Sequence, residues 1–342
     1  MRRSIMRNEA SLRQWKELYE LTLKIKNLEP WKYFWDMDLL TIILPERKEP
    51  IYFSILGNGG HHFGILTYSG YDAYNDFIDI IESEDSGTPV DYLMLEQSCL
   101  ACNFGNREEV PPNQKKIIKE LALGFRGKNQ WIYFESFKKG YMPYILDEAE
   151  VILLTEAYNQ LLKMLLDYIE QHINISFESG ETLIHYYDED QKQWVNKSTV
   201  PNVPRREIQN ITLADAILKA NLKGQKKIIA NLELDMLYVC TDVKDDKFDR
   251  PINPKIVLLA DNISGAIIQQ EVLTPEDNEI QAVFRLLIGF IQHYGIPQKV
   301  YFRIPLIKHI IGDLCTELGI QIIKRKRLKA ADKFKKEFLR FT

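Results

Sequence analysis

Cys99-Leu-Ala-Cys102 is a CxxC motif, and two thiols at this spacing can do redox chemistry or supply half of a zinc site. A redox pair usually opens a helix, and a zinc site needs two more ligands at similar spacing, whereas Cys240 and Cys315 stand alone. The motif lies in a segment with the pattern of a strand, on which residues 99 and 102 point to opposite faces. The pattern therefore favours buried structural thiols over a redox or metal site.

Two other groups of side chains have the types that bind ligands. His61 and His62 follow a Gly-Gly turn, but adjacent strand residues diverge, which disfavours joint chelation of a metal ion. Asp36 and Asp38 share one face of an extended segment that begins with the aromatic stretch 31–35. Paired carboxylates beside aromatic rings can form a sugar or metal site. They can equally be a polar strand edge next to a packed aromatic cluster, which is the commoner case.

The largest local charge anomaly is the basic segment, residues 324–342. It carries nine basic and two acidic side chains, a net charge of +7, and leaves −11 for residues 1–323. Phe334, Phe338 and Phe341 recur at spacings of 4 and 3 among these cations. Three interpretations compete: a docked final helix with a solvated basic face, a surface for nucleic-acid phosphates, and a membrane-surface helix, which usually needs a larger apolar face.

The nucleic-acid interpretation of the basic segment has six candidate residues: Lys324, Arg325, Lys326, Arg327, Lys329 and Lys333. Each Lys or Arg that contacts a phosphate releases a counterion, so binding would weaken steeply with salt. The charge asymmetry also allows an acidic protein surface, of this or another chain, as the partner. No membrane partner is expected.

These residues must be positioned by two predicted domains, 1–200 and 205–342, separated by Pro201-Asn-Val-Pro204. The first is predicted to be α+β with a mainly antiparallel sheet. Its helices are predicted over residues 9–28, 71–81, 113–123 and 146–173. Its strands are predicted over residues 38–44, 51–56, 62–68, 90–104, 131–137, 182–187 and 193–196, with a loop over 82–89.

The second domain is predicted to be α/β, with the order β-β-β-α-β-α-β-α. Its strands are predicted over residues 232–243, 255–261, 266–273, 299–303 and 320–323, and its helices over 274–294, 305–318 and 329–341. Thr274-Pro-Glu-Asp277 has the chemistry of a helix start, with Thr274 as the N-cap.

Residues 232–342 resemble the ribonuclease H-like fold of integrase and transposase cores in this element order. Val257-Leu-Leu-Ala-Asp261-Asn-Ile-Ser-Gly265 looks like their second strand and turn. Tyr294-Gly-Ile-Pro297 before a strand, and Leu318-Gly-Ile320, look like their later landmarks. The resemblance implies a place for two metal ions between carboxylates on the first strand, at the end of the fourth strand and on the last helix.

This chain departs from that pattern at the fourth strand, which ends in Arg303, because a cation there repels a divalent metal ion. Asp235 suits the first strand, while the last helix offers Asp332 and Glu337 among lysines. Asp261 occupies a non-catalytic position, where capping a turn is the simpler role. The domain is thus predicted to be inactive by the two-metal route. The enzymatic alternative is a divergent metal-dependent nuclease that uses Asp235, Asp261 and Glu337.

The first half of the chain is similar to a two-domain family of bacterial proteins of unknown function. The phrases that carry this similarity are Pro30-Trp31, Gly57-Asn-Gly-Gly60, Tyr68-Ser-Gly70, Phe125-Arg-Gly127 and Gly140-Tyr-Met-Pro143. The similarity implies a two-domain organisation and does not indicate an activity.

Composition excludes membrane-spanning, collagen-like, disulfide-scaffold and largely disordered classes. The 342 residues are 45% hydrophobic and 27% charged with a net charge of −4, and no apolar run approaches the ~20 residues that cross a bilayer. Residues 1–10 lack the apolar region of a secretory signal, and the chain has four cysteines. Together these features indicate a protein of the reducing cytoplasm. The sequence contains no Gly-x-Ser-x-Gly, HExxH or P-loop motif. We expect a non-enzymatic binding or regulatory protein, without cofactor or metal, whose partner is unknown.

Overall fold

The computed structural model describes residues 7–171 and 173–338, and the chain divides into two compact units. The N-terminal unit comprises Met1–Ile78, Gln97–Lys138 and Pro143–Arg205. The C-terminal unit comprises Asp79–Glu96, Lys139–Met142 and Arg206–Thr342. Two short segments from the first half of the chain therefore belong to the C-terminal unit. The division into continuous domains 1–200 and 205–342 stays a prediction.

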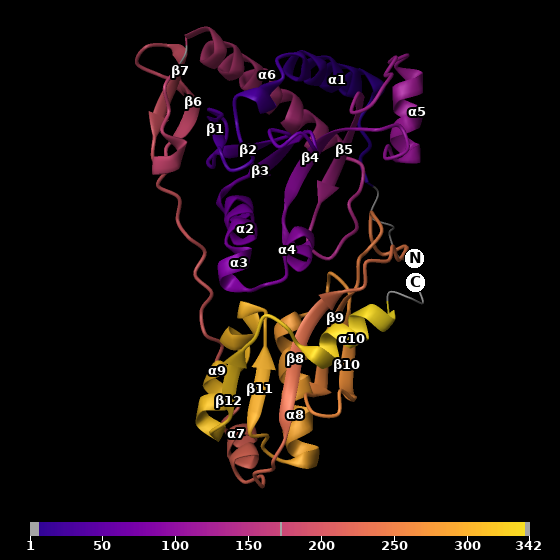
Figure 1. Cartoon of the computed structure of the whole chain (residues 1–342), viewed down its shortest axis with the longest axis vertical. Coiled ribbons are helices and arrows are strands. Elements are labelled where there is room, and N and C mark those ends of the chain that lie inside the picture. Colours follow the sequence, from indigo (N-terminus) through magenta and orange to yellow (C-terminus); the bar gives the residue numbers. More distant parts are fainter. Residues whose placement is uncertain (1–6, 172, 339–342) are drawn as a thin grey trace. The chain divides into compact units, whose positions relative to one another are not determined.

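The N-terminal unit is built on a seven-stranded sheet with the order β5-β4-β3-β2-β1-β6-β7 (Figure 1). Its strands are β1 (Leu40–Ile43), β2 (Ile51–Leu56), β3 (Gly64–Ser69), β4 (Cys99–Gly105), β5 (Trp131–Phe137), β6 (Thr182–Asp188) and β7 (Gln193–Thr199). All neighbouring strands pair antiparallel except β1 and β6, which are parallel. The prediction of a mainly antiparallel α+β architecture is confirmed.

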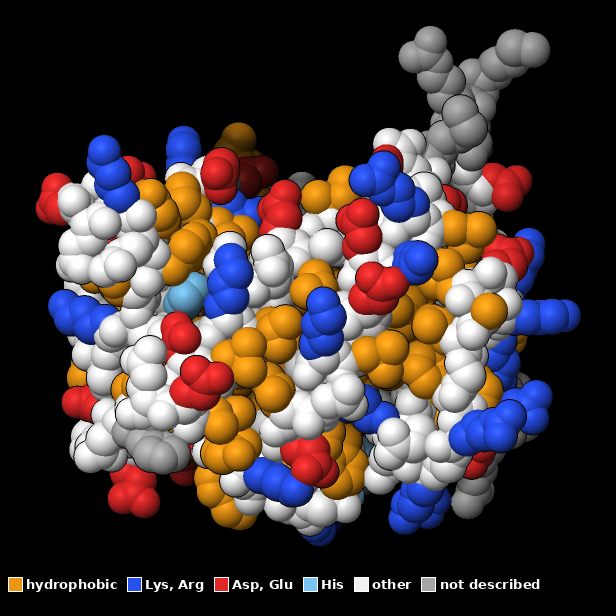
Figure 2. Space-filling view, turned by 90° about the horizontal axis from the view of Figure 1, so that it is seen from above, with side chains coloured by type: hydrophobic (Ala, Val, Ile, Leu, Met, Phe, Trp, Pro, Cys, Tyr) orange, Lys and Arg blue, Asp and Glu red, His pale blue; other side chains and the backbone are white. Residues whose placement is uncertain are grey.

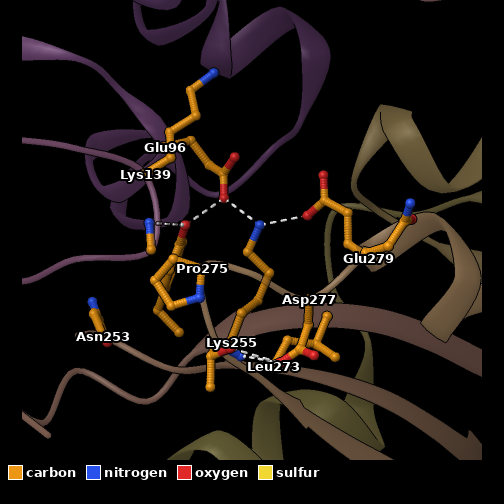
Figure 3. A pocket seen from close by; sticks show the side chains of 12 residues that line it. Glu96, Lys139, Asn253, Lys255, Leu273, Pro275, Asp277 and Glu279 are labelled. Atoms are coloured by element: carbon orange, nitrogen blue, oxygen red, sulfur yellow. Dashed lines mark hydrogen bonds and ion pairs between the residues drawn. The ribbon is translucent and has the colours of Figure 1, made fainter. Parts of the chain in front are cut away.

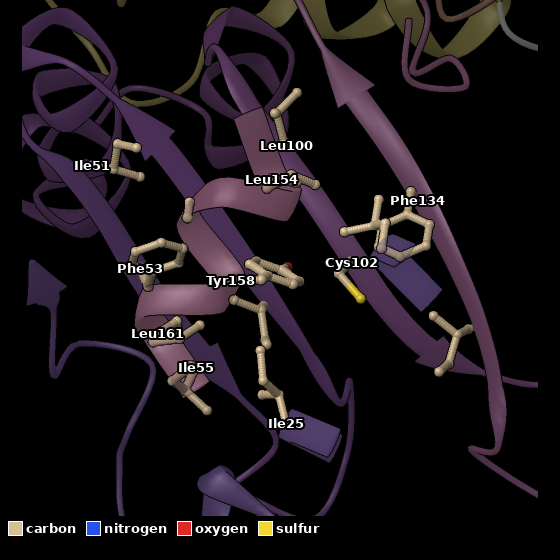
Figure 4. Close-up of a cluster of buried hydrophobic side chains, with 14 of the residues drawn as sticks. Ile25, Ile51, Phe53, Ile55, Leu100, Cys102, Phe134, Leu154, Tyr158 and Leu161 are labelled. Atoms are coloured by element: carbon tan, nitrogen blue, oxygen red, sulfur yellow. The ribbon is translucent and has the colours of Figure 1, made fainter. Parts of the chain in front are cut away.

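Two long helices supply most of the apolar surface that covers this sheet. The helices of this part of the chain are α1 (Leu12–Asn27), η1 (Pro30–Lys32), α2 (Tyr71–Ile81), α5 (Pro112–Glu120), α6 (Glu148–Gln171) and η2 (Phe177–Ser179). Ser11 caps α1 through a capping box with Gln14. Figure 4 shows Tyr158 of α6 between Phe53 of β2 and Cys102 of β4, and all three side chains are buried.

The predicted strand over residues 90–104 is wrong in its first half. Helix α4 (Val90–Glu96) precedes β4, and a short helix α3 (Ser83–Ser86) lies in the predicted loop. The backbone N–H groups of Tyr92 and Leu93 donate to the carbonyl of Pro89, which starts the helical turn. Tyr92 is buried in the core of the C-terminal unit, so tertiary packing selected the helix over the strand.

The C-terminal unit has a five-stranded sheet with the order β10-β9-β8-β11-β12 (Figure 1). Its strands are β8 (Asn231–Tyr238), β9 (Lys255–Asp261), β10 (Ile267–Leu273), β11 (Lys299–Phe302) and β12 (Gln321–Lys324). Strands β8, β9 and β10 pair antiparallel in succession, and β11 pairs parallel with both β8 and β12. Its helices after Arg206 are α7 (Ala216–Lys223), α8 (Glu279–Tyr294), α9 (Pro305–Leu318) and α10 (Lys329–Phe338).

The alternation of side chains along β8 separates two layers of helices. Leu232, Leu234 and Met236 share one core with residues of α8 and α9. Leu237 shares a smaller core with Ala331 of α10. Helices α8 and α9 thus cover one face of the sheet and α10 covers the other. Glu233 and Asp235 alternate onto the α10 face.

From β8 onward the elements follow the predicted order β-β-β-α-β-α-β-α. The ribonuclease H-like family stays a prediction. The predicted start of α8 at Thr274 is wrong, because Asn278 is the N-cap and accepts from the backbone N–H of Gln281. The Asp277 carboxylate instead accepts from the backbone N–H and hydroxyl of Thr274, which closes a separate turn before the helix.

On the face drawn in Figure 2, acidic and basic side chains are interspersed with small hydrophobic areas. Within residues 7–171 and 173–338, none of the helices has the length and apolar character needed to span a bilayer.

Candidate functional site

Three charged side chains meet on the α10 face of the C-terminal sheet. Asp235 extends from β8, Arg303 directly follows β11, and Asp332 lies in the first turn of α10. Arg303 Nη2 lies 2.5 Å from Asp235 Oδ2, and Nη1 lies 2.5 Å from Asp332 Oδ1. Asp235 is fully buried and Arg303 is 6% exposed. We call these three residues the Arg303 cluster.

Burial dominates the electrostatics of the Arg303 cluster. It raises the pKa of Asp235 to about 6, even though Arg303 attracts the ionised form. Burial also opposes the charged guanidinium, but Asp235 and Asp332 outweigh it and raise the pKa of Arg303. Asp235 Oδ1 and Arg303 Nε are buried without a hydrogen-bond partner among the described residues. The guanidinium therefore stays charged in the position between the two carboxylates.

Glu233, two residues before Asp235 on β8, holds the N-terminus of α10. Its Oε2 accepts from the backbone N–H groups of Ala330 at 2.8 Å and Ala331 at 3.1 Å. Its Oε1 accepts from Asn262 Nδ2 at 2.6 Å. A carboxylate at a helix N-terminus is favoured by the free N–H groups and the helix dipole. Glu233 thus places α10, and with it Asp332, over the sheet. Its role as a cap was missed in the sequence.

The three residues of the nuclease alternative do not converge. Asp261 Oδ1 accepts from the backbone N–H and the hydroxyl of Ser264, both at 2.6 Å, and these bonds lower the pKa of Asp261. Glu337 lies 3.8 Å from Lys333 on the exposed side of α10. Asp235 is engaged by Arg303. Among the described residues, no group of three or more His, Cys, Asp or Glu side chains is arranged to hold a metal ion.

The basic segment is docked at its apolar side and open at its cationic side. Phe334 and Phe338 pack against the α10 face of the sheet, and the side chains of residues 324–327 are exposed. The Arg325 guanidinium lies 3.6 Å from the centroid of the Tyr301 ring. Arg340 and Phe341 lie outside the described residues.

Some cations of the basic segment are engaged and others are available. Lys326 Nζ donates to the Glu84 carbonyl at 3.0 Å, and Lys335 pairs with Asp91. Lys324 lies near Lys308, and partial burial together with this like charge lowers the pKa of Lys324. Within the part of the chain that the structure describes, six exposed cations of the basic segment form no ion pair: Lys324, Arg325, Lys326, Arg327, Lys329 and Lys336.

Cys99 and Cys102 lie on β4 and are buried, as free thiols. Burial raises the pKa of both thiols, which disfavours the reactive thiolate. Their odd spacing on a strand directs them to opposite faces.

The Asp36 and His61-His62 motifs come together around a cavity of about 280 Å³ in the N-terminal unit. Trp35 also lines it and is 58% exposed. Asp38 does not line this cavity, and its carboxylate accepts from the backbone N–H of Trp35 at 2.8 Å. The structure therefore joins two motifs that the sequence presents separately.

A polar pocket of about 280 Å³ in the C-terminal unit was missed in the sequence (Figure 3). Lys255 Nζ lies 2.6 Å from Glu96 Oε1 and 2.6 Å from Glu279 Oε2, and the Tyr238 hydroxyl donates to Glu96 Oε1 at 2.6 Å. Burial lowers the pKa of Lys255, but the two glutamates outweigh it and raise that pKa. The ammonium group therefore stays charged and does not serve as an amine nucleophile.

The amide of Asn253 also lines this pocket. Its Oδ1 accepts from the backbone N–H of Cys240, while its Nδ2 is buried without a partner among the described residues. No sequence signal joins Glu96 to Lys255 or Glu279, because local spacing carries no information about residues so far apart along the chain.

Comparisons with known proteins find two domain families. Residues 218–339 match a domain of unknown function, DUF6930, and residues 15–185 match another, DUF7309. No curated protein matches the chain. Among solved structures, the simian T-cell lymphotropic virus intasome in complex with PP2A regulatory subunit B56 gamma is similar at 15% identity and a TM-score of 0.24. The match covers 34% of this chain and 43% of that chain, less than half of its length. Because the DUF7309 model spans half of the sequence, the protein belongs to the DUF7309 family and carries a DUF6930 domain in its second half.

Proposed function

We propose that this chain is a non-enzymatic binding protein of the cytoplasm, in which Arg303 stands where a metal-dependent nuclease would hold its cations. The observation that carries the proposal is the pair of 2.5 Å contacts from Arg303 to Asp235 and Asp332. The first strand, the end of the fourth strand and the last helix supply these three residues. They are the positions at which the ribonuclease H-like resemblance expects metal ligands.

The resident guanidinium opposes metal binding in two ways. Its charge repels a divalent cation, and an arginine side chain does not lose its proton in proteins. It also occupies one oxygen of each carboxylate, an atom with which a magnesium ion could otherwise be coordinated. A two-metal mechanism needs carboxylates that are free to bind both ions. The Arg303 cluster therefore supports a binding role over phosphodiester cleavage.

Incubation of the full chain with DNA and RNA in magnesium or manganese tests the proposal. We expect no cleavage by the wild type, and no manganese binding at Asp235 by electron paramagnetic resonance. The matched control is Asp246→Ala, which removes an exposed aspartate of the same unit, beside the test variant Asp235→Ala. Cleavage that persists in the control and disappears in Asp235→Ala would establish the nuclease alternative instead.

A second candidate function is phosphate-backbone binding by the basic segment. The observation that favours it is the set of exposed cations without ion pairs among the described residues, which includes Lys324, Arg327 and Lys329 together with Arg325, Lys326 and Lys336. Lys308 of α9 adds a further positive charge near Lys324. Neighbouring like charges without counterions are typical of surfaces that neutralise a polyanion.

A further inference from the structure

The N-terminal unit contains a cavity that neither the Arg303 cluster nor the basic segment involves. It has a volume of about 530 Å³ and is open to solvent. Residues 106–108, after β4, residues 125–128, before β5, and Trp131, the first residue of β5, line it. Strands β4 and β5 are antiparallel neighbours, with Gly105 paired to Trp131, so the two loops meet at one end of this hairpin. The volume is within the range of small-molecule sites.

Positive charge predominates in this cavity. Arg107, Arg126 and Lys128 line it and are exposed, and Glu108 is the carboxylate that lines it with them. Within residues 7–171 and 173–338, none of these three cations forms an ion pair. Three unneutralised cations raise the electrostatic potential locally, in a chain whose net charge is −4. Arginine and lysine together are the side chains that recognise phosphate groups.

Aromatic surface lies beside these cations. The Arg107 guanidinium is 5.8 Å from the centroid of the Trp131 ring, and the Phe125 ring meets Trp131 edge-on with centroids 5.9 Å apart. Trp131 is only partly buried and lines the cavity. A planar base can stack on an indole ring or on a guanidinium plane, and such stacking is largely independent of base identity.

We propose that this cavity binds a nucleotide, with Arg126 and Lys128 on the phosphate and with Trp131 and Arg107 on the base. The ligand is either a free mononucleotide or one nucleotide of a single strand, because both present a phosphate beside a planar ring. A phosphate alone would contact only Arg126 and Lys128, and a planar ring alone would contact only Trp131 and Arg107. The proposal is independent of the basic segment, which belongs to the C-terminal unit.

Tryptophan fluorescence and calorimetry on the full chain test this site. The background is Lys324→Gln/Arg327→Gln/Lys329→Gln, which weakens the basic segment as a competing site. The probes are AMP, an eight-nucleotide oligouridine, adenosine and inorganic phosphate. We expect AMP or the oligouridine to bind more tightly than adenosine or phosphate and to quench fluorescence, and we expect Trp131→Phe to remove the quenching.

Two double variants that each remove two positive charges are compared. The test variant is Arg126→Gln/Lys128→Gln in the cavity, and the control variant is Lys115→Gln/Lys116→Gln on α5. The cavity variant is expected to weaken binding about tenfold or more, and the α5 variant to leave it unchanged. Binding of AMP identifies a free nucleotide, and binding of the oligouridine alone identifies a single strand. Absence of binding by both probes, or equal affinity in the two variants, overturns the proposal whatever the outcome at Arg303.

Discussion

Arg303 is the residue on which the interpretation of the C-terminal unit depends. Its charge satisfies two carboxylates, one of which is fully buried. The folded pKa of Asp235, about 6, lies above the ordinary value of 3.8. Between these pH values the folded chain holds a proton that the unfolded chain has lost. The contribution of Asp235 to stability is therefore greatest in acid and is lost as the pH rises through 6.

Arg303→Met is expected to destabilise the C-terminal unit by about 3–5 kcal/mol at pH 8, because Asp235 then carries a buried charge without a partner. The loss should be smaller at pH 5, where the unpaired carboxyl binds a proton. Urea unfolding at pH 8 and pH 5, with hydrogen exchange of the β8 amides as the probe of the C-terminal unit, measures the loss of stability at each pH. The control, Arg285→Met, removes an exposed arginine paired with Glu271 and should cost less than about 1 kcal/mol at either pH. A penalty for Arg303→Met that does not change with pH would contradict this account of Asp235.

Three element ends meet at Lys255. Glu96 is the last residue of α4, Lys255 is the first of β9, and Glu279 is the first of α8. Glu279 lies at a helix N-terminus, where the helix dipole favours a negative charge, but Glu96 lies at a C-terminus, where it does not. Burial raises the pKa of Glu96, yet the attraction of Lys255 outweighs burial and holds that pKa below its ordinary value. Lys255 therefore keeps α4 joined to the sheet.

Lys255→Met is expected to lower the stability of the C-terminal unit by about 3 kcal/mol at pH 7, because two glutamates lose their shared cation. Glu96 stabilises the wild type above its ordinary pKa of 4.5, and this contribution is lost as the pH falls through its lower folded value. Without Lys255 the folded pKa of Glu96 rises. The difference in free energy of unfolding between Lys255→Met and the wild type should therefore be smaller at pH 5 than at pH 7. Chemical unfolding at pH 5 and pH 7 measures this effect.

Two further variants separate this ion pair from a general effect of lost charge. Lys255→Met/Glu96→Gln should recover part of the stability, because it removes one of the two unpaired carboxylates. Lys223→Met removes a lysine that pairs with Glu317 at the surface and should change stability little. Equal losses for Lys255→Met and Lys223→Met would show that the buried ion pair does not stabilise α4.

Charge is unevenly distributed over the whole chain. The basic segment has a net charge of +7, and the remaining 323 residues have −11. The whole-molecule charge of −4 therefore hides a cationic surface. Long-range repulsion between the acidic remainder of the chain and a polyanion opposes binding, whereas local contacts between the basic segment and the polyanion favour binding. Salt screens the long-range interaction within about 10 Å at 0.1 M, so the local contacts govern binding at physiological ionic strength.

Binding of a short DNA duplex through the basic segment is expected to weaken steeply with salt. Lys324→Gln/Arg327→Gln/Lys329→Gln should make the slope of log K against log salt shallower by about 0.9 for each lost phosphate contact, close to 3 in all. Arg13→Gln/Lys16→Gln/Lys24→Gln removes the same charge from α1 and should leave the slope unchanged. Fluorescence anisotropy over a salt series measures both slopes. Identical slopes for the two triple variants would exclude the basic segment as the contact surface.

The sequence predicted several elements to the residue in both halves of the chain, among them β2, α2 and β5 in the first half. The strand over 255–261 and the helix over 305–318 coincide with β9 and α9, because apolar periodicity and Pro or Gly boundaries agree there. The strand predicted over 90–104 was wrong in its first half, because the burial of Tyr92 selected a helix. The helix start predicted at Thr274 was wrong because a side-chain turn has the same residue types as an N-cap.

The residue order alone predicts Arg303 at the end of a strand where the family resemblance expects a carboxylate, and it predicts a strong positive charge from residue 324 onward. The folded chain is needed to show that Arg303 binds Asp235 and Asp332. It is also needed to show that Glu96 meets Lys255, and that two loops line the open cationic cavity beside Trp131. The physical reason is that periodicity and capping act over a few residues. Ion pairs and cavities instead depend on which distant segments share a sheet face or a loop cluster, and packing of the whole core selects those neighbours.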